Sequence, residues 1–306
     1  MNKMFVESLL LCILATLMSC GNKNVVVPDS PAPAPFEADV RFASLDSLAD
    51  FMMEEFSAKT VDEYVSRYEQ QAVAIKSYGL LNHRKEEKYP LDETVCSDLR
   101  ELADSLSAGS TMDMVMCGRI WRGVCHYLTA KDYLGKSKKP LYQAEMCDWL
   151  VLEDELGNLY CDLSYLTYWG GTIAHVIASG SYWTLAETRQ NDYSKLCNKG
   201  PFETDQKWTI ASARENFLQE LADAKSPDLD DPDLDDPDMY DPDMYDREGF
   251  IALRNQMRER ADRVVVLLDK WLASRAELCK AEGIPDTHTA SLVAQLGTHI
   301  MEIIEE

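Results

Sequence analysis

Four copies of a five-residue acidic unit divide this chain into two parts. Residues 227–246 contain PDLDD, PDLDD, PDMYD and PDMYD, with ten Asp and no Lys or Arg. A proline at every fifth position interrupts a helix, and the aspartates repel one another. The repeat could bind calcium, but a high-affinity calcium loop needs a glycine turn and a bidentate acid at fixed positions, and no unit contains glycine. We therefore predict a solvated acidic spacer over 226–247.

The rest of the chain has the composition of a globular protein. Hydrophobic residues make up 46% of the 306 residues, and the net charge is −23, of which the repeat supplies ten charges. So acidic a chain repels the phosphates of nucleic acid, which excludes a nucleic-acid partner. Nine cysteines include no C-x-x-C pair, and no phosphate loop or dinucleotide fingerprint is present. We therefore expect no metal site and no cofactor.

The N-terminus has the features of an export signal. Lys3 precedes an apolar run over 9–18 that is too short to cross a bilayer. The run ends in Leu17-Met18-Ser19-Cys20, which resembles the lipobox of bacterial lipoproteins. That resemblance implies a signal peptide over 1–19 and acyl chains such as palmitate on Cys20; the alternative is an ordinary signal peptide with an incidental cysteine. The proline-rich segment 20–42 is then expected to be a lipidated tether.

The resemblance to lipoproteins also implies a location. Gly21, rather than Asp, follows Cys20, and by the Gram-negative sorting rule this favours the outer membrane. Export to the cell surface is associated with an acidic run after the cysteine, and here Asn22, Lys23 and Asn24 follow instead. We expect anchoring in the outer membrane through lipid at Cys20, facing the periplasm, with the cell surface as the alternative. The partners would be the membrane and an envelope protein or peptidoglycan.

Hydrophobic periodicity predicts that most of the mature chain is helical. Apolar residues recur at three- and four-residue steps, the spacing of one helix face. The segments with this pattern are 45–56, 61–79, 97–107, 111–128, 208–224, 248–282 and a last helix from about 286. Thr60 and Glu63 have the spacing of a capping box at the start of the second of these helices.

Two other segments predict strands. Residues 148–153 and 158–164 are rich in β-forming side chains on either side of Asp-Glu-Leu-Gly, which predicts a β-hairpin, and 165–200 would add short strands. The fold class we expect is therefore α+β: a mostly helical domain over 43–225 with a small antiparallel sheet, followed after the spacer by an antiparallel helical hairpin over 248–306.

One constellation of residues suggests chemistry. Cys117 lies in a predicted helix, Cys147 directly precedes a predicted strand thirty residues later, and Asp162 lies in the next strand. This order, with a Trp, a Gly and an aromatic residue in register, resembles the core of transglutaminase-like proteins over about 95–165. The resemblance implies Cys117 as a nucleophile and Asp162 as the residue that orients a catalytic His.

The position of that His is occupied by Cys147. A thiol is a poor proton acceptor and cannot form the imidazolium that activates a cysteine nucleophile. We expect Cys117, Cys147 and Asp162 to converge in one pocket, with His126 and His175 as the histidines that could replace the missing base. The function we expect is a non-catalytic binding or scaffolding protein of the envelope. The alternative is a transglutaminase- or peptidase-like enzyme that uses Cys117.

Overall fold

The computed structural model describes residues 36–83, 89–168, 171–198, 200–202, 207–225 and 247–305. Residues 1–37 form one unit and residues 38–306 a second unit, to which nearly all described residues belong. The signal peptide, Cys20 and the acidic repeat lie outside the described residues, so the predictions made for them stay predictions.

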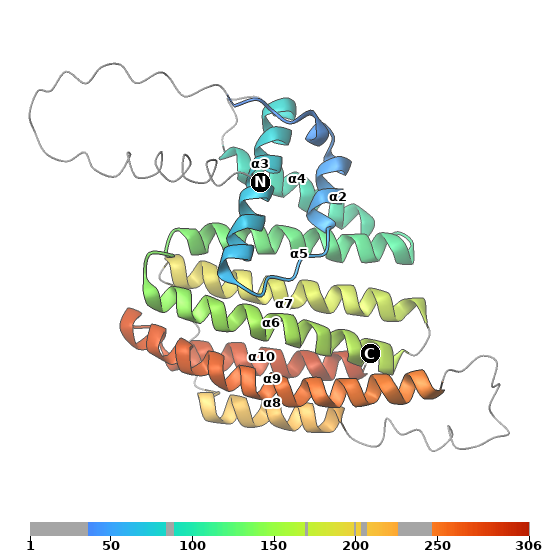
Figure 1. The fold of residues 1–306 in the computed structure, drawn as a ribbon, viewed down its shortest axis with the longest axis vertical. Helices are drawn as coiled ribbons and strands as arrows, with labels where there is room; N and C mark the ends of the chain where they lie inside the picture. Colours follow the sequence, from blue (N-terminus) through green and yellow to red (C-terminus); the bar gives the residue numbers. More distant parts are fainter. Residues whose placement is uncertain are drawn as a thin grey trace, which may run out of the picture. The chain divides into compact units, whose positions relative to one another are not determined.

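The described elements of the second unit are helices (Figure 1). In chain order they are η1 (Val40–Phe42), α2 (Leu45–Met53), α3 (Val61–Asn82), α4 (Leu91–Leu106), α5 (Thr111–Leu134), α6 (Pro140–Thr167), α7 (Thr172–Asn198), α8 (Ile210–Ala224), α9 (Arg247–Glu282) and α10 (Asp286–Glu305). The predicted capping box is present, because Thr60 and Glu63 each accept from the other's backbone N–H.

The expected α+β fold was wrong, because no strand occurs among the described residues. The two predicted strands, 148–153 and 158–164, both lie in α6, and most of 165–200 forms α7. Helix α6 packs against α7 on one side and α9 on another, so it buries apolar residues around most of its circumference. A helix buried on several sides loses the one-sided apolar stripe, and its dense apolar runs then resemble buried strands.

Gly157, which we took for the turn of a hairpin, lies in the middle of α6. A Cβ atom added there would lie 2.4 Å from Cε1 of Tyr182 on α7, far inside van der Waals contact. The glycine is therefore needed for the close approach of two helices, which a single sequence does not distinguish from a turn.

The long helices lie side by side in Figure 1, with α7 against both α5 and α6. Helices α2, α3 and α4 pack on α5. The two C-terminal helices are joined at Gly283, whose φ is 72°, but their main contacts are not with each other. Helix α9 packs on α6 and α10 packs on α8, so the two helices of the predicted hairpin pack mainly on earlier helices and share their core.

A cluster of fully buried charged side chains joins α6, α7, α9 and α10, and we call it the buried ion network. Its members are Glu145, Arg189, Asp192, Arg275 and His288. Both oxygens of Glu145 accept from Arg189, at 2.9 and 2.7 Å. Asp192 accepts from Arg275 and Arg189 and lies 3.0 Å from Nε2 of His288. Burial alone would raise the pKa of Asp192, but the two arginines and His288 outweigh it and hold that pKa well below its usual range.

Candidate functional site

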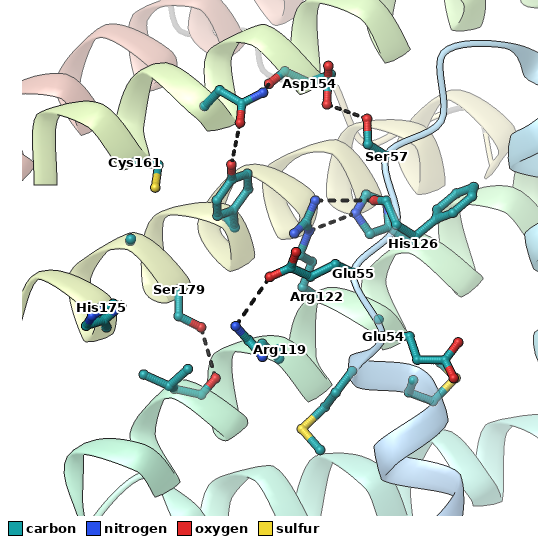
Figure 2. A pocket seen from close by; sticks show the side chains of 18 of the residues that line it. Glu54, Glu55, Ser57, Arg119, Arg122, His126, Asp154, Cys161, His175 and Ser179 are labelled. Carbon is teal, nitrogen blue, oxygen red and sulfur yellow. Dashed lines mark hydrogen bonds and ion pairs between the residues drawn. The ribbon is translucent and has the colours of Figure 1, made fainter. Parts of the chain in front are cut away.

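A cavity of about 500 Å³ lies among α5, α6, α7 and the segment that follows α2, and we call it the central pocket (Figure 2). This volume is typical of a site for a small molecule. The segment over 52–57 can approach α5 because Gly123 has no side chain: a Cβ there would lie 2.4 Å from the carbonyl oxygen of Met52.

Helix α5 supplies the basic wall of the central pocket. Arg119, Arg122 and His126 are three or four residues apart, so they lie on one face of the helix and line the cavity together. Arg119 is half exposed and lies 3.4 Å from Glu55, which is a surface ion pair. Arg122 is less exposed than Arg119, and its guanidinium stacks on an aromatic ring instead of pairing with a carboxylate.

The guanidinium of Arg122 has only weak polar partners. Its Nε donates to Nε2 of His126 at 3.4 Å, and Nη2 donates to the carbonyl oxygen of Phe56 at 3.5 Å. The guanidinium carbon lies 4.3 Å from the centre of the Tyr182 ring, a cation–π contact. Among the described residues, no carboxylate forms an ion pair with Arg122. The guanidinium therefore has no direct ion-pair partner in the described part of the chain, although its charge acts on Glu153 at longer range.

Helix α6 supplies the opposite wall, which carries Asp154, Asn158 and Cys161. The hydroxyl of Ser57 donates to Oδ1 of Asp154. In the part of the chain that the structure describes, no Lys, Arg or His forms an ion pair with Asp154. Asn158 donates to the main-chain oxygen of Asp154 at 2.7 Å and accepts from the Tyr182 hydroxyl at 3.0 Å.

His126 is uncharged at neutral pH. Burial, together with the nearby charges of Arg122 and Arg67, lowers the pKa of His126 to about 3. Since arginine only donates, Nε2 of His126 accepts from Arg122, which places the proton of the neutral ring on Nδ1. Glu153 lies 3.7 Å from the same ring nitrogen, accepts from the indole of Trp149 at 2.6 Å, and has a pKa raised by burial. A histidine that protonates only near pH 3 is a poor general base.

The structure does not bring the three predicted catalytic residues together in one pocket. Cys117 is buried in α5, where burial, and then the charge of Asp104, raises the pKa of its thiol. Cys147 is exposed near the start of α6. Asp162 lies fifteen residues further along α6, about 22 Å at 1.5 Å per residue, so the two cannot share a pocket.

Asp162 has a structural partner of its own. Its carboxylate accepts from Nε of Arg260 at 2.7 Å and from Gln256 at 3.1 Å, both on α9. It therefore fastens α9 to α6 rather than orienting a histidine. None of Cys117, Cys147 and Asp162 lines the central pocket.

The cysteine and histidines that do line the pocket are Cys161, His126 and His175. Burial raises the pKa of the Cys161 thiol to about 11, which keeps it protonated at neutral pH. His175 lies 2.6 Å from the Tyr165 hydroxyl. Sequence reasoning proposed both histidines but missed Arg119, Arg122 and Asp154, whose signal was polar residues at helical spacing inside otherwise apolar segments.

Comparison with known proteins gave no match to any family model, curated protein or solved structure. Within the described ranges, no helix is long and apolar enough to cross a membrane. Nor do the described residues include a group of three or more His, Cys, Asp or Glu side chains placed to hold a metal ion.

Proposed function

We propose that this chain is a lipid-anchored protein of the bacterial outer membrane that binds a small polar molecule in the central pocket without catalysing a reaction on it. The observation that carries the proposal is the cavity itself, about 500 Å³ in volume and lined by charged and polar side chains from three core helices. Sites on the helices of a rigid core hold their geometry better than sites on loops.

The chemistry of the lining side chains favours binding over catalysis. Nucleophilic catalysis needs a thiolate or hydroxyl beside a base that can take its proton. The Cys161 thiol stays protonated. The Ser57 hydroxyl donates to the carboxylate of Asp154, and a carboxylate is a much weaker base than the imidazole that usually activates a serine; no histidine bonds to Ser57 among the described residues. His126 has too low a pKa to accept a proton near neutrality. The pocket therefore offers recognition groups but no activated nucleophile.

The proposed location rests on the sequence. Cys20 ends a lipobox-like run, and Gly21 favours the outer membrane. We place the folded unit on the periplasmic side, where it would meet small molecules that have crossed the outer membrane or come from peptidoglycan turnover.

Two cysteines of α6 make a direct test. Cys161 lines the pocket, whereas Cys147 is exposed and lies outside it. The rate of alkylation of each thiol by iodoacetamide would be followed by peptide mass spectrometry, with and without the low-molecular-weight fraction of a periplasmic extract. We expect slower labelling of Cys161 and unchanged labelling of Cys147. Unchanged labelling of both would contradict binding in the pocket.

A further inference from the structure

The charges that line the central pocket are not all paired. At its edge, Arg67 pairs with Glu54 at 3.0 Å and Arg119 lies 3.4 Å from Glu55, and both carboxylates are exposed. In contrast, Arg122 on α5 has no carboxylate partner among the described residues. Asp154 on α6 has no basic partner within the same ranges. One positive and one negative charge thus remain unpaired on facing walls (Figure 2).

Other side chains hold these two charged groups in place. Tyr182 stacks on the guanidinium of Arg122, and its hydroxyl donates to Asn158. Asn158 in turn donates to the backbone of Asp154, and Ser57 donates to the carboxylate. A site whose groups are already oriented loses less conformational entropy when a ligand binds.

Among the described residues, no carboxylate forms a direct ion pair with Arg122. Glu153 is the nearest candidate, because its Oε1 lies 3.7 Å from Nε2 of His126, the same nitrogen that accepts from Nε of Arg122 at 3.4 Å. Its carboxylate accepts from Trp149, and burial raises the pKa of Glu153 more than the charge of Arg122 lowers it. A partly desolvated charge without a partner is unfavourable in the folded protein, so an incoming ion of opposite sign gains free energy there.

We propose that the central pocket binds a small zwitterion, an amino acid or a short peptide with free ends. The carboxylate of the ligand contacts the guanidinium of Arg122, and its ammonium group contacts the carboxylate of Asp154. Arginine suits this role because its planar fork donates two parallel hydrogen bonds to a carboxylate. This inference rests on the proposed function and adds the chemical class of the ligand.

The ligand's own charges give the decisive test on the unaltered protein. The probes are L-alanine, L-alanyl-L-alanine and L-alanyl-L-alanyl-L-alanine, with binding measured by isothermal titration calorimetry. For the tightest of these, the N-acetyl form lacks the positive charge and the C-terminal amide lacks the negative charge. We expect each blocked form to bind roughly tenfold more weakly or worse, the usual loss when a hydrogen bond to a charged group is removed.

Two variants assign each end of the ligand. Arg122→Gln should weaken binding of the free peptide and of its N-acetyl form, but not the residual binding of the amide. Asp154→Asn should show the opposite selectivity. Arg214→Gln is the matched control, because it removes a partly exposed arginine that lies outside the pocket and pairs with Asp269, and it should leave all affinities nearly unchanged.

The outcomes separate this inference from the proposed function. If the periplasmic fraction protects Cys161 but no free peptide or amino acid binds, or the blocked forms bind equally well, the zwitterion inference is wrong and pocket binding stands. If neither the fraction nor any probe protects Cys161, both proposals are wrong. Loss of affinity at the matching end of the ligand in each variant would support both.

Discussion

Removing the charge of Glu145 would test whether the buried ion network holds four helices together. The substitution Glu145→Gln keeps the size of the side chain but removes one of the two negative charges. In the native protein its carboxylate accepts two hydrogen bonds from Arg189, one from the Trp271 indole at 2.8 Å and one from Arg275 at 3.4 Å. The variant would leave two buried guanidinium groups facing only Asp192.

The expected cost follows from this geometry. Breaking a fully buried ion pair by removing one partner destabilises a protein by about 3–5 kcal/mol, because the remaining charge stays buried without compensation. That is a large part of the roughly 5–15 kcal/mol by which a typical domain is stable. Asp148→Asn, three residues away on α6, is the control: its partner Lys270 is 61% exposed, and such surface pairs contribute about 0–1 kcal/mol.

The free energy of unfolding would be measured by urea titration, followed by far-UV circular dichroism. We expect a much lower transition midpoint for Glu145→Gln, an unchanged slope, and a small effect for Asp148→Asn. Adding Arg275→Met to Glu145→Gln restores charge balance, so the double variant should lose less stability than the sum of the two single variants. Equal, small losses in Glu145→Gln and Asp148→Asn would refute the reasoning.

Four further predictions concern other parts of the chain. Cys20→Ala should leave an unprocessed precursor without acyl label, and palmitate labelling that persists would contradict lipidation. Replacing 227–246 with a Gly-Ser linker of equal length should change the melting temperature little, since the prolines and aspartates of the repeat offer little apolar surface to bury. A fall of tens of degrees, or loss of micromolar calcium binding, would disprove a spacer. In His126→Gln, the free energy of unfolding should fall less steeply as the pH is lowered. In the wild type, the unfolded histidine protonates below its pKa near 6.5 while the folded one stays neutral down to about pH 3, which costs about 1.4 kcal/mol of stability per pH unit in that window. Equal pH dependence of the free energy of unfolding in the two proteins, measured by urea titration, would contradict this. Gly157→Ala should destabilise the protein, because the added Cβ would overlap Tyr182 of α7. Gly180→Ala should stabilise it by about 0.4–1 kcal/mol, because a Cβ there would have nothing within 4 Å. If differential scanning calorimetry ranked the two variants the other way, the packing argument would be wrong.

The linker in the second of these experiments keeps its length for a structural reason. The backbone oxygen of Lys225, at the end of α8, accepts from Arg258 at 3.3 Å, in the interior of α9. Helix α9 begins eleven residues earlier, about 16 Å away along the axis. A direct deletion would therefore strain the connection, and a loss of stability could not be assigned to the repeat.

Local signals predicted the helices whose contacts are one-sided. The capping-box spacing of Thr60 and Glu63 predicted the start of α3, and the apolar stripe that includes Phe250, Met257 and Trp271 predicted α9. These features depend on residues within one or two turns, so a single sequence contains them. What the stripe of α9 packs against, helix α6 rather than α10, is a property of the tertiary fold and has no local signal.

Helix α6 shows why the predicted sheet failed. Its segment from Trp149 to Leu152 is apolar on consecutive positions because α7 and α9 cover different faces of it. Gly157 strengthened the error, since a glycine after two acidic residues suits a turn as well as it suits a close contact with Tyr182. Helical burial on several sides and a buried strand give the same pattern at this length. Once α6 is one helix, the spacing of Cys147 and Asp162 no longer indicates adjacent strands.

The residues of the candidate site were hidden for a related reason. Arg122 and Asp154 are thirty-two residues apart and face each other only because α7 holds α5 and α6 together. Each is one charge among many on a strongly charged chain, and charged residues on helices are usually solvated. Of the residues that line the pocket, His126 and His175 were predicted as candidate bases, because the chain has only five histidines.

The two groups of charges in this protein follow opposite rules, and the contrast bears on function. In the buried ion network, Glu145 and Asp192 share two arginines and a histidine, so that no charge lacks a partner of opposite sign. This fold therefore pairs its buried charges where they serve only to hold helices together. Yet Arg122 and Asp154, on facing walls of a cavity large enough for a small molecule, each lack such a partner among the described residues. A ligand that carries both charges would pair with each of them and so offset the unfavourable free energy of leaving them unpaired. Ligand recognition is therefore the physical reason that we infer for the unpaired charges.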